Sequence, residues 1–279
     1  MSEAISTEKE QNVFVVGHTN PDTDSICSAI AYANLKQKVT GKKYTAKRAG
    51  LVSPETEFVL KRFDIKTPGY ISDVREQVKD MIIREVPGIN KEMSLKKAWD
   101  IMDKDTLATL PVVNEDKDLV GLISVADIAK SYMDVYDSEI LAKAETSYKN
   151  ILEVLEGTMI VGNPDANVTE GKVLIAAANP EMMETYIDAG DMVILGNRYE
   201  SQLCAIEMNA KCIVVCTGAD VSKTITRLAE NKGCTIIQTK YDTYMASRLI
   251  NQSMPIDYFM RKDGFVTFTT EDFIEDIRA

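Results

Sequence analysis

The sequence predicts an α/β protein with more than one domain, and three stretches carry that prediction. Val13–Val16 has the β-branched and aromatic composition of a buried strand, and apolar residues then recur at helical spacing as far as Ala33. Residues 94–133 follow an α-β-turn-β-α order. Residues 146–250 alternate short apolar strands with helical stretches, which is typical of a doubly wound α/β domain.

The composition is that of a globular protein large enough for two or three domains. Of its 279 residues, 45% are hydrophobic and 27% are charged. The formal net charge of -11 argues against a broad surface for nucleic acid or for an anionic membrane, because both attract clustered Lys and Arg. No run of about 18 apolar residues occurs. We therefore expect a cytoplasmic protein without nucleic-acid or membrane partners, in which residues 1–11 form a disordered tail.

A polar cluster follows the first predicted strand, where the sequence GHTNPDTDS holds His18, Asp22 and Asp24. Open α/β sheets bind ligands at such turns. One imidazole and two carboxylates on one loop suit a divalent ion such as Mn²⁺ or Mg²⁺. Ser25 or Asp24 is expected to cap the helix that follows. The alternative to a metal site is that Asp22 and Asp24 only shape and cap the turn, with His18 as a polar neighbour. The imidazole, which no cap needs, favours the metal site.

The next elements continue the same domain. Residues 44–52 predict a short strand, and residues 53–63 predict a helix with Ser53 as its N-cap and Pro54 at its first position. Two strands and two helices cannot cover both faces of a parallel sheet. Residues 12–69 are therefore expected to be only the first part of a domain.

The α-β-turn-β-α stretch begins with a helix capped by Ser94 and includes the sequence GLISVADI at residues 121–128. Ser124 and Asp127 stand three residues apart where the second strand becomes a helix. They could hold a phosphate and a ribose diol beside the helix N-terminus. They could equally form an ordinary helix cap, and the spacing alone favours the cap.

The last large stretch contains five strand-like runs and two polar loops. Residues 196–198 and 217–219 follow two of the strands and could approach a ligand, although tight turns explain them equally well. The five cysteines lie in apolar patterns without paired C-x-x-C spacing, so buried reduced thiols are expected. The strand-like runs are residues 158–162, 172–178, 191–197, 211–218 and 234–240.

The motif GHTNPDTDS, followed by AKRAGLVSPETEFVLKRF, resembles the amino-terminal part of the family II inorganic pyrophosphatases of the Asp-His-His superfamily. Residues 70–136 resemble a CBS (cystathionine-β-synthase) domain, residues 145–250 a DRTGG domain, and residues 254–279 the start of a second CBS domain. This order is similar to the subfamily with a CBS-DRTGG-CBS insert that binds adenine nucleotides. The DRTGG match is degenerate, with Asn197 and Ala219 in place of Asp and Gly.

The resemblance implies a metal-dependent hydrolase of pyrophosphate, with residues 12–69 as the first part of its catalytic domain. His18 and Asp22 would bind one Mn²⁺ or Mg²⁺ and Asp24 a second, so that two ions clamp the phosphoryl group and activate water. The family completes these sites with a later Asp-His-His motif, whereas this sequence has one histidine. We therefore expect a chain truncated within the second CBS domain. The alternative function is a non-catalytic adenine-nucleotide sensor.

The resemblance also implies regulation by AMP, ADP or ATP. CBS domains use a Ser and an Asp at this strand-to-helix junction for phosphate and ribose, which assigns nucleotide binding to Thr109, Ser124 and Asp127. A single CBS unit leaves apolar helix faces that the family buries against another unit, so a homodimer is expected. The residues predicted to form those faces are Ala98, Met102, Ile128 and Met133.

Overall fold

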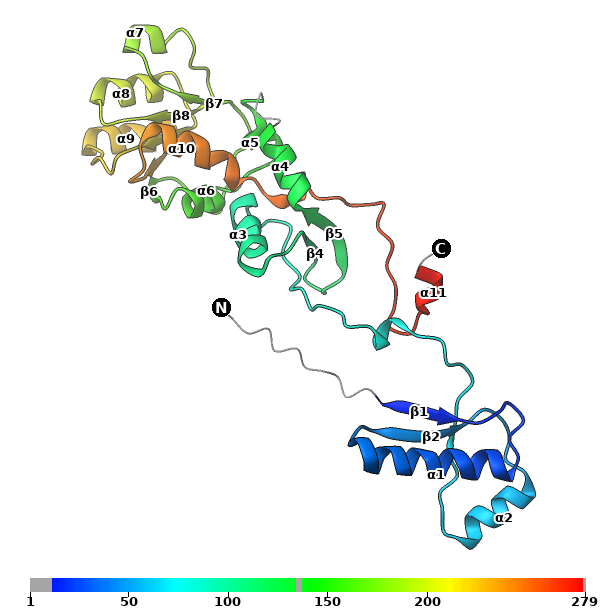
Figure 1. Ribbon diagram of the computed structural model, residues 1–279. Coiled ribbons are helices and arrows are strands. Elements are labelled where there is room, and N and C mark those ends of the chain that lie inside the picture. Colours follow the sequence, from blue (N-terminus) through cyan, green and yellow to red (C-terminus); the bar gives the residue numbers. More distant parts are fainter. Residues whose placement is uncertain (1–11, 134–136, 278–279) are drawn as a thin grey trace. The chain divides into compact units, whose positions relative to one another are not determined.

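The structure, a computed structural model, divides into two compact units (Figure 1). In the N-terminal unit, residues up to Ile83 join residues from Thr267 onward, and the central unit is Arg84–Val266. The predicted tail of residues 1–11 lies outside the residues that the structure describes. The described residues are 12–133 and 137–277.

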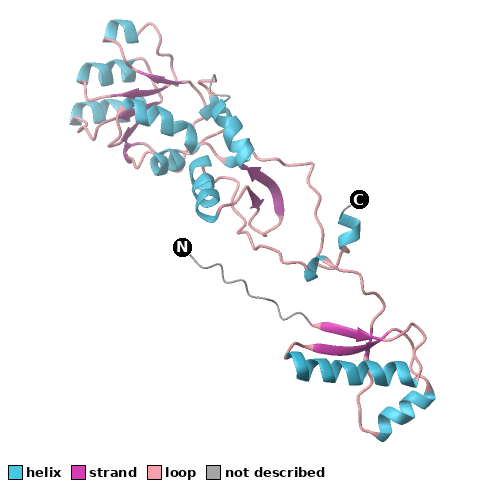
Figure 2. Cartoon of the chain, in the orientation of Figure 1, coloured by secondary structure: helices cyan, strands magenta, loops and turns pink. Residues whose placement is uncertain are grey.

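The N-terminal unit contains a parallel three-stranded sheet in the order β1-β2-β3 (Figure 2). Its strands are β1 (Val13–Val16), β2 (Tyr44–Arg48) and β3 (Gly69–Tyr70). Helix α1 (Thr23–Thr40) connects β1 to β2, and α2 (Pro54–Arg62) connects β2 to β3. Adjacent parallel strands need such crossover connections. The predicted opening of a parallel-sheet domain is therefore present.

The core of this sheet is small. None of the residues in the three strands is fully buried, and Phe14 and Tyr70 are about half exposed. Two strand-helix units therefore cover the sheet incompletely, as the sequence predicts. The fully buried apolar residues of this part are Ile26, Ala29, Ala33 and Leu60, all from helices.

A short segment pairs with the last described residues inside the same unit. Gln77 forms an antiparallel bridge with Phe273, and the Arg75 guanidinium lies 3.9 Å from the centre of the Phe273 ring. Helix α11 (Ile274–Ile277) follows. A 3₁₀ turn, η1, covers Val78–Asp80.

The central unit begins with the predicted α-β-turn-β-α order. It consists of α3 (Leu95–Asp105), the antiparallel strands β4 (Thr109–Val113) and β5 (Leu119–Ser124), and α4 (Val125–Met133). The Ser94 hydroxyl accepts a hydrogen bond from the third backbone N–H of α3, which confirms the predicted cap.

A five-stranded sheet follows in the order β6-β10-β9-β8-β7. Four strands are parallel: β7 (Val173–Ile175), β8 (Met192–Leu195), β9 (Cys212–Val215) and β10 (Thr235–Gln238). The edge strand β6 (Thr158–Val161) runs antiparallel to β10. All five predicted strands are present, and only the direction of β6 departs from the predicted parallel alternation.

Helices cover both faces of this sheet. Successive strand residues point to opposite faces, so Val193 and Leu195 pack with α7, α8 and α9. Met192 and Ile194 face α6 and α10 and share one core with Ile123 of the β4-β5 hairpin. The remaining helices are α5 (Ile140–Lys143), α6 (Tyr148–Val154), α7 (Pro180–Met183), α8 (Tyr199–Glu207), α9 (Lys223–Lys232), α10 (Thr243–Ile250) and the 3₁₀ turns η2 (Asn251–Ser253) and η3 (Ile256–Tyr258).

After α10 the chain returns to the β4-β5 hairpin. Arg261 and Leu122 exchange two backbone hydrogen bonds of 2.8 and 3.0 Å, which extends the hairpin beside β5. Ile256 and Met260 are buried in the core of the same hairpin. Residues 254–261, predicted to open a second CBS domain, therefore pack on the first one.

Candidate functional site

The predicted metal loop joins β1 to α1, and its helix cap differs from the prediction. Asp22 is the N-cap of α1, and its Oδ1 accepts a hydrogen bond from the Ser25 N–H at 2.8 Å. The sequence favours Ser25 or Asp24 as the cap, and that expectation is wrong because the helix already begins at Thr23. Asp22 thus takes the capping role that the alternative interpretation gives to this loop.

His18 and Asp22 lie side by side on the surface of the loop. The His18 Nε2 is 3.5 Å from the Asp22 Oδ1, and the two side chains are 58% and 67% exposed. The hydrogen bond from the Ser25 N–H, and with it the His18 imidazole, holds the pKa of Asp22 below its ordinary value. The pair therefore presents an open nitrogen and an ionised carboxylate, which a divalent cation can use.

Asp24 does not form a metal-binding group with that pair. Its Oδ1 accepts a hydrogen bond from the Ser28 hydroxyl, one turn further along α1, at 3.2 Å. In the described part of the chain, no three His, Cys, Asp or Glu side chains come close enough to hold a metal ion. The donor chemistry of His18 and Asp22 fits a divalent cation, but these residues supply only part of a coordination shell.

The loop packs tightly where it leaves β1. A side chain at Gly17 would place its Cβ 1.9 Å from the Ser25 Oγ, so this position requires glycine. The Ser25 Oγ is buried and has no hydrogen-bond partner within residues 12–133 and 137–277. The helix N-terminus is thus pressed against the end of β1, which sets the position of the loop between them.

The predicted nucleotide residues lie together at the junction of β5 and α4. Thr109 pairs directly with Ser124 across the hairpin. The Ser124 N–H and hydroxyl both donate to Asp127 Oδ2, at 2.9 and 2.5 Å, and the Asp127 N–H donates to the Ser124 Oγ at 3.3 Å. These reciprocal bonds have the geometry of a capping box, as the cap interpretation predicts.

The second oxygen of Asp127 faces a residue that sequence reasoning missed. Asp127 Oδ1 lies 3.6 Å from the Nε of Arg261, which is 67% exposed while Asp127 is 16% exposed. One signal was available: a glycine inside a strand indicates a close backbone approach. A Cβ at Gly121 would lie 2.8 Å from the Arg261 carbonyl oxygen and 2.9 Å from the Met260 Sδ.

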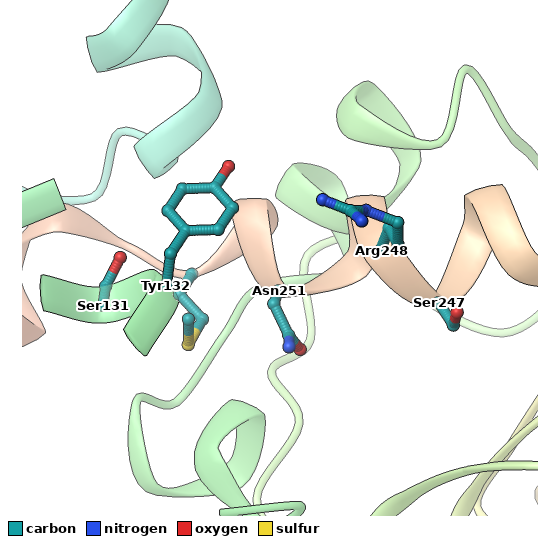
Figure 3. Close-up of a pocket in the computed structure, with 6 residues that line it drawn as sticks. Ser131, Tyr132, Ser247, Arg248 and Asn251 are labelled. Carbon is teal, nitrogen blue, oxygen red and sulfur yellow. The ribbon is translucent and has the colours of Figure 1, made fainter. Parts of the chain in front are cut away.

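Two cavities lie near the end of α4, and neither contains Ser124 or Asp127. Figure 3 shows the first, of about 360 Å³, with the Arg248 guanidinium directed toward the Tyr132 side. The Tyr244 hydroxyl accepts a hydrogen bond from Arg248 at 3.3 Å and raises the pKa of its guanidinium. The second, of about 510 Å³, is lined mainly by apolar side chains. The linings are Ser131, Tyr132, Ser247, Arg248, Asn251 and Met254 for the first, and Lys96, Trp99, Val125, Ile128, Ala129, Tyr132 and Gln252 for the second.

The helix faces predicted to bind a partner are mostly buried within the chain itself. Ala98, Met102 and Ile128 are core residues of the central unit, whereas Met133 is exposed. The expectation of open faces at these three residues is wrong because the hairpin and residues 254–260 already cover them. The exposed apolar side chains of α3 and α4 are Trp99, Tyr132 and Met133.

The two polar loops of the five-stranded sheet use their backbone groups internally. Thr217 and Gly218 have positive φ angles, and their N–H groups donate to Tyr241 and Thr239, each at 2.8 Å. The Gly196 carbonyl accepts from the Gln202 side chain at 3.2 Å. The tight-turn interpretation therefore accounts for these loops.

Four of the five cysteines are buried, as their apolar surroundings predict, and Cys27 is partly exposed. Burial raises the pKa of Cys216 to about 11 and that of Cys234 to about 12, which keeps both thiols protonated and unreactive. None of the described helices has the length and apolarity needed to cross a bilayer.

Two domain families match the central part of the chain. The DRTGG domain family matches residues 150–253, and the CBS domain family matches residues 78–134. The CBS and DRTGG domains of the regulatory region of Clostridium perfringens pyrophosphatase, in a crystal structure with the activator diadenosine tetraphosphate, have a similar fold. The TM-score is 0.69 at 38% identity, covering 73% of this chain and 89% of that one.

Similar full-length sequences are pyrophosphatases. The cobalt-dependent inorganic pyrophosphatase of Clostridium perfringens is 39% identical over 267 residues, which are 96% of this chain and 49% of that protein. The probable manganese-dependent inorganic pyrophosphatase of Thermotoga maritima is 30% identical over 269 residues, which are 96% of this chain and 49% of that protein. The chain thus spans about half the length of these relatives.

Proposed function

The chain belongs to the family II inorganic pyrophosphatases that contain CBS and DRTGG domains, and on this premise we propose that it provides a metal-binding loop and a nucleotide-binding regulatory region to such an enzyme. The observation that carries the proposal is the likeness of its central unit to a regulatory region that binds diadenosine tetraphosphate. The reaction is the hydrolysis of pyrophosphate to two phosphates.

In this proposal His18, Asp22 and Asp24 are the catalytic metal ligands of the chain. A bound Mn²⁺, Mg²⁺ or Co²⁺ would neutralise phosphate charge and lower the pKa of a bound water. The Ser25 N–H keeps the Asp22 carboxylate ionised, and the exposed His18 imidazole stands beside it. Asp24, whose carboxylate accepts a hydrogen bond from the Ser28 hydroxyl, would bind the second ion.

The regulatory half of the proposal places AMP, ADP or ATP at Thr109, Ser124 and Asp127. Asp127 Oδ2 is already held by Ser124, so Oδ1 is the oxygen that can accept ribose hydroxyl groups. The three residues are positioned by hairpin pairing and by the capping box, so little ordering is needed when a ligand binds.

We also propose a cytoplasmic homodimer without nucleic-acid or membrane partners. The exposed Trp99, Tyr132 and Met133 on α3 and α4 supply the kind of aromatic and Met surface that protein interfaces favour. The net charge of -11 supports the absence of polyanionic partners.

Two measurements test the proposal. Calorimetric titration of the chain with ADP should give saturable binding, and lack of binding by ADP, AMP and ATP would refute the regulatory half. The coding sequence after Ala279 should encode an Asp-His-His motif, and its absence would refute the catalytic half.

One observation favours the second candidate, a nucleotide sensor without catalysis. The sequence has a single histidine, and in the described residues no three His, Cys, Asp or Glu side chains come close enough to hold a metal ion. Pyrophosphate hydrolysis by the chain with Mn²⁺ or Co²⁺, abolished in His18→Ala, would exclude that candidate.

A further inference from the structure

We propose that Arg261 binds the phosphate groups of the nucleotide at the Ser124–Asp127 site. This inference rests on the proposed nucleotide function. It identifies the Arg261 guanidinium as the positively charged group of that site. Arg261 comes from residues 254–261, which return to the hairpin only after the whole five-stranded sheet. The GLISVADI motif therefore does not indicate that a guanidinium group lies beside Ser124 and Asp127.

The backbone holds Arg261 at the site. Both of its main-chain polar groups pair with Leu122, two residues before Ser124, at 2.8 and 3.0 Å. Gly121 permits this approach, since any Cβ there would lie within 2.9 Å of both Arg261 and Met260. Burial of Met260 in the hairpin core fixes the segment from the other side.

The side chain is free to exchange partners. Asp127 Oδ2 is occupied by Ser124, whereas Oδ1 has the Arg261 Nε at 3.6 Å, too long for a hydrogen bond. The guanidinium is mostly exposed, and ion pairs that reach the solvent are weak. Ribose hydroxyls that donate to Oδ1 would therefore displace Arg261 at little cost, and the guanidinium would turn to the phosphates.

The charges around the site make this cation necessary. Asp127 by itself repels phosphate, and the chain carries a net charge of -11. A guanidinium can bind a phosphate through two parallel N–H groups, which an ammonium group cannot do. The neighbouring cation, Lys262, is paired with Asp257 at 3.1 Å. The ligand class is thus a ribonucleotide whose affinity rises with its phosphate groups.

The alternative role for Arg261 is to tie residues 254–261 to the hairpin. The full chain and its Arg261→Gln variant are titrated with adenosine, AMP and ADP at low and high salt. We expect Arg261→Gln to weaken ADP binding about tenfold, AMP less and adenosine little, and to reduce the salt dependence for ADP. Arg261→Lys should recover part of the ADP affinity, because it keeps the charge without the bidentate geometry.

Lys262→Gln is the matched control, because it removes the same charge at the adjacent residue. It should leave the preference for ADP over adenosine unchanged. Equal losses for adenosine and ADP in Arg261→Gln, or no loss for either, would overturn the inference while the nucleotide site stands. If the unaltered chain binds none of the three ligands, the proposed nucleotide function fails and the inference fails with it.

Discussion

The two predicted sites differ in how completely their own surroundings hold them. In the loop after β1, His18 and Asp22 are more than half exposed. At the β5-α4 junction, Ser124 and Asp127 are held by three mutual hydrogen bonds, and Asp127 is 16% exposed. A hairpin and one helix turn hold Ser124 and Asp127 in place, whereas His18, Asp22 and Asp24 do not form a complete metal-binding group in the described residues.

The hydrophobic cores around the two sites also differ, because the central unit is more completely buried than the N-terminal unit. The inner strands β8, β9 and β10 of the central sheet are almost fully buried because helices cover both of its faces. In the N-terminal sheet, no strand residue is fully buried. Tight packing on both sides keeps a site in place, so the central unit is the more rigid frame.

The largest expected effect tests this difference in packing. Ile213→Ala, in the middle of the central sheet, should lower the free energy of unfolding by about 4 kcal/mol because its cavity cannot collapse. Ile26→Ala in α1 should cost about 2 kcal/mol, since its one-sided surroundings can relax. Denaturant unfolding followed by Trp99 fluorescence and by limited proteolysis measures both. Ile160→Ala, at a partly exposed position, is the control, and equal costs for Ile213 and Ile26 would contradict the comparison.

The next effect concerns the nucleotide site. Asp127→Ala should abolish ribonucleotide binding and also remove a helix cap worth about 1 kcal/mol. Asp127→Asn keeps a capping oxygen, so we expect binding weakened about tenfold with little change in the unfolding midpoint. Calorimetry and thermal unfolding separate the two roles. Asp116→Asn, exposed in the hairpin turn, is the control. Unchanged nucleotide binding in both Asp127 variants would mean that Asp127 serves only as part of the helix cap.

A smaller effect is expected at the metal loop. Mn²⁺ should bind the chain with micromolar or weaker affinity, because His18 and Asp22 supply two adjacent ligands. His18→Ala and Asp22→Asn should each weaken it further, whereas Glu55→Gln, exposed on α2, should not. Titration followed by Mn²⁺ paramagnetic resonance gives these affinities. Tight binding of two ions would contradict this prediction, because it would require more metal ligands than the structure places at the loop.

The smallest effect is the acid response of α1. The pKa of Asp22 is lowered from 3.8 in the folded chain, so its cap is fully effective above pH 3.8 and is lost as the pH falls through the folded pKa. Asp22→Asn should therefore show less loss of α1 structure between pH 4 and pH 2 than the unaltered chain. Amide resonances of residues 23–28 report this loss. An identical acid response in the two proteins would mean that the charge of Asp22 does not stabilise the helix.

Much of the fold was predictable because local patterns determine it. All the predicted strands of both sheets are present, whereas the two-residue β3 (Gly69–Tyr70) was not predicted, and the Ser53 and Ser94 caps follow from a hydroxyl before a helical pattern. The cap of α1 was missed because three polar residues, Asp22, Asp24 and Ser25, all suit that role. Only the residue at which the helix begins distinguishes them, and boundaries depend on packing.

The residues of the proposed nucleotide site were predictable except for Arg261. Ser124 and Asp127 stand three residues apart, and that spacing alone allows their hydrogen bonds across a helix start. The position of Arg261 depends on pairing with Leu122, a contact between distant segments that no local period encodes. Gly121 was the one sequence signal of this contact. A glycine within a strand indicates a close backbone approach, but it does not identify the segment that approaches.

By itself, the sequence determined most of the helices and strands and the capping pair at Ser124 and Asp127, and it predicts metal-ligand chemistry for the first loop. Tertiary structure alone decided that Asp24 does not join His18 and Asp22 in one metal-binding group of the described residues, that β6 runs antiparallel, and that residues 254–261 pair with the hairpin. The physical reason is the sequence separation over which each kind of contact acts. Backbone spacing fixes which side chains meet within one turn, whereas contacts between distant segments follow from which apolar faces the whole chain buries together.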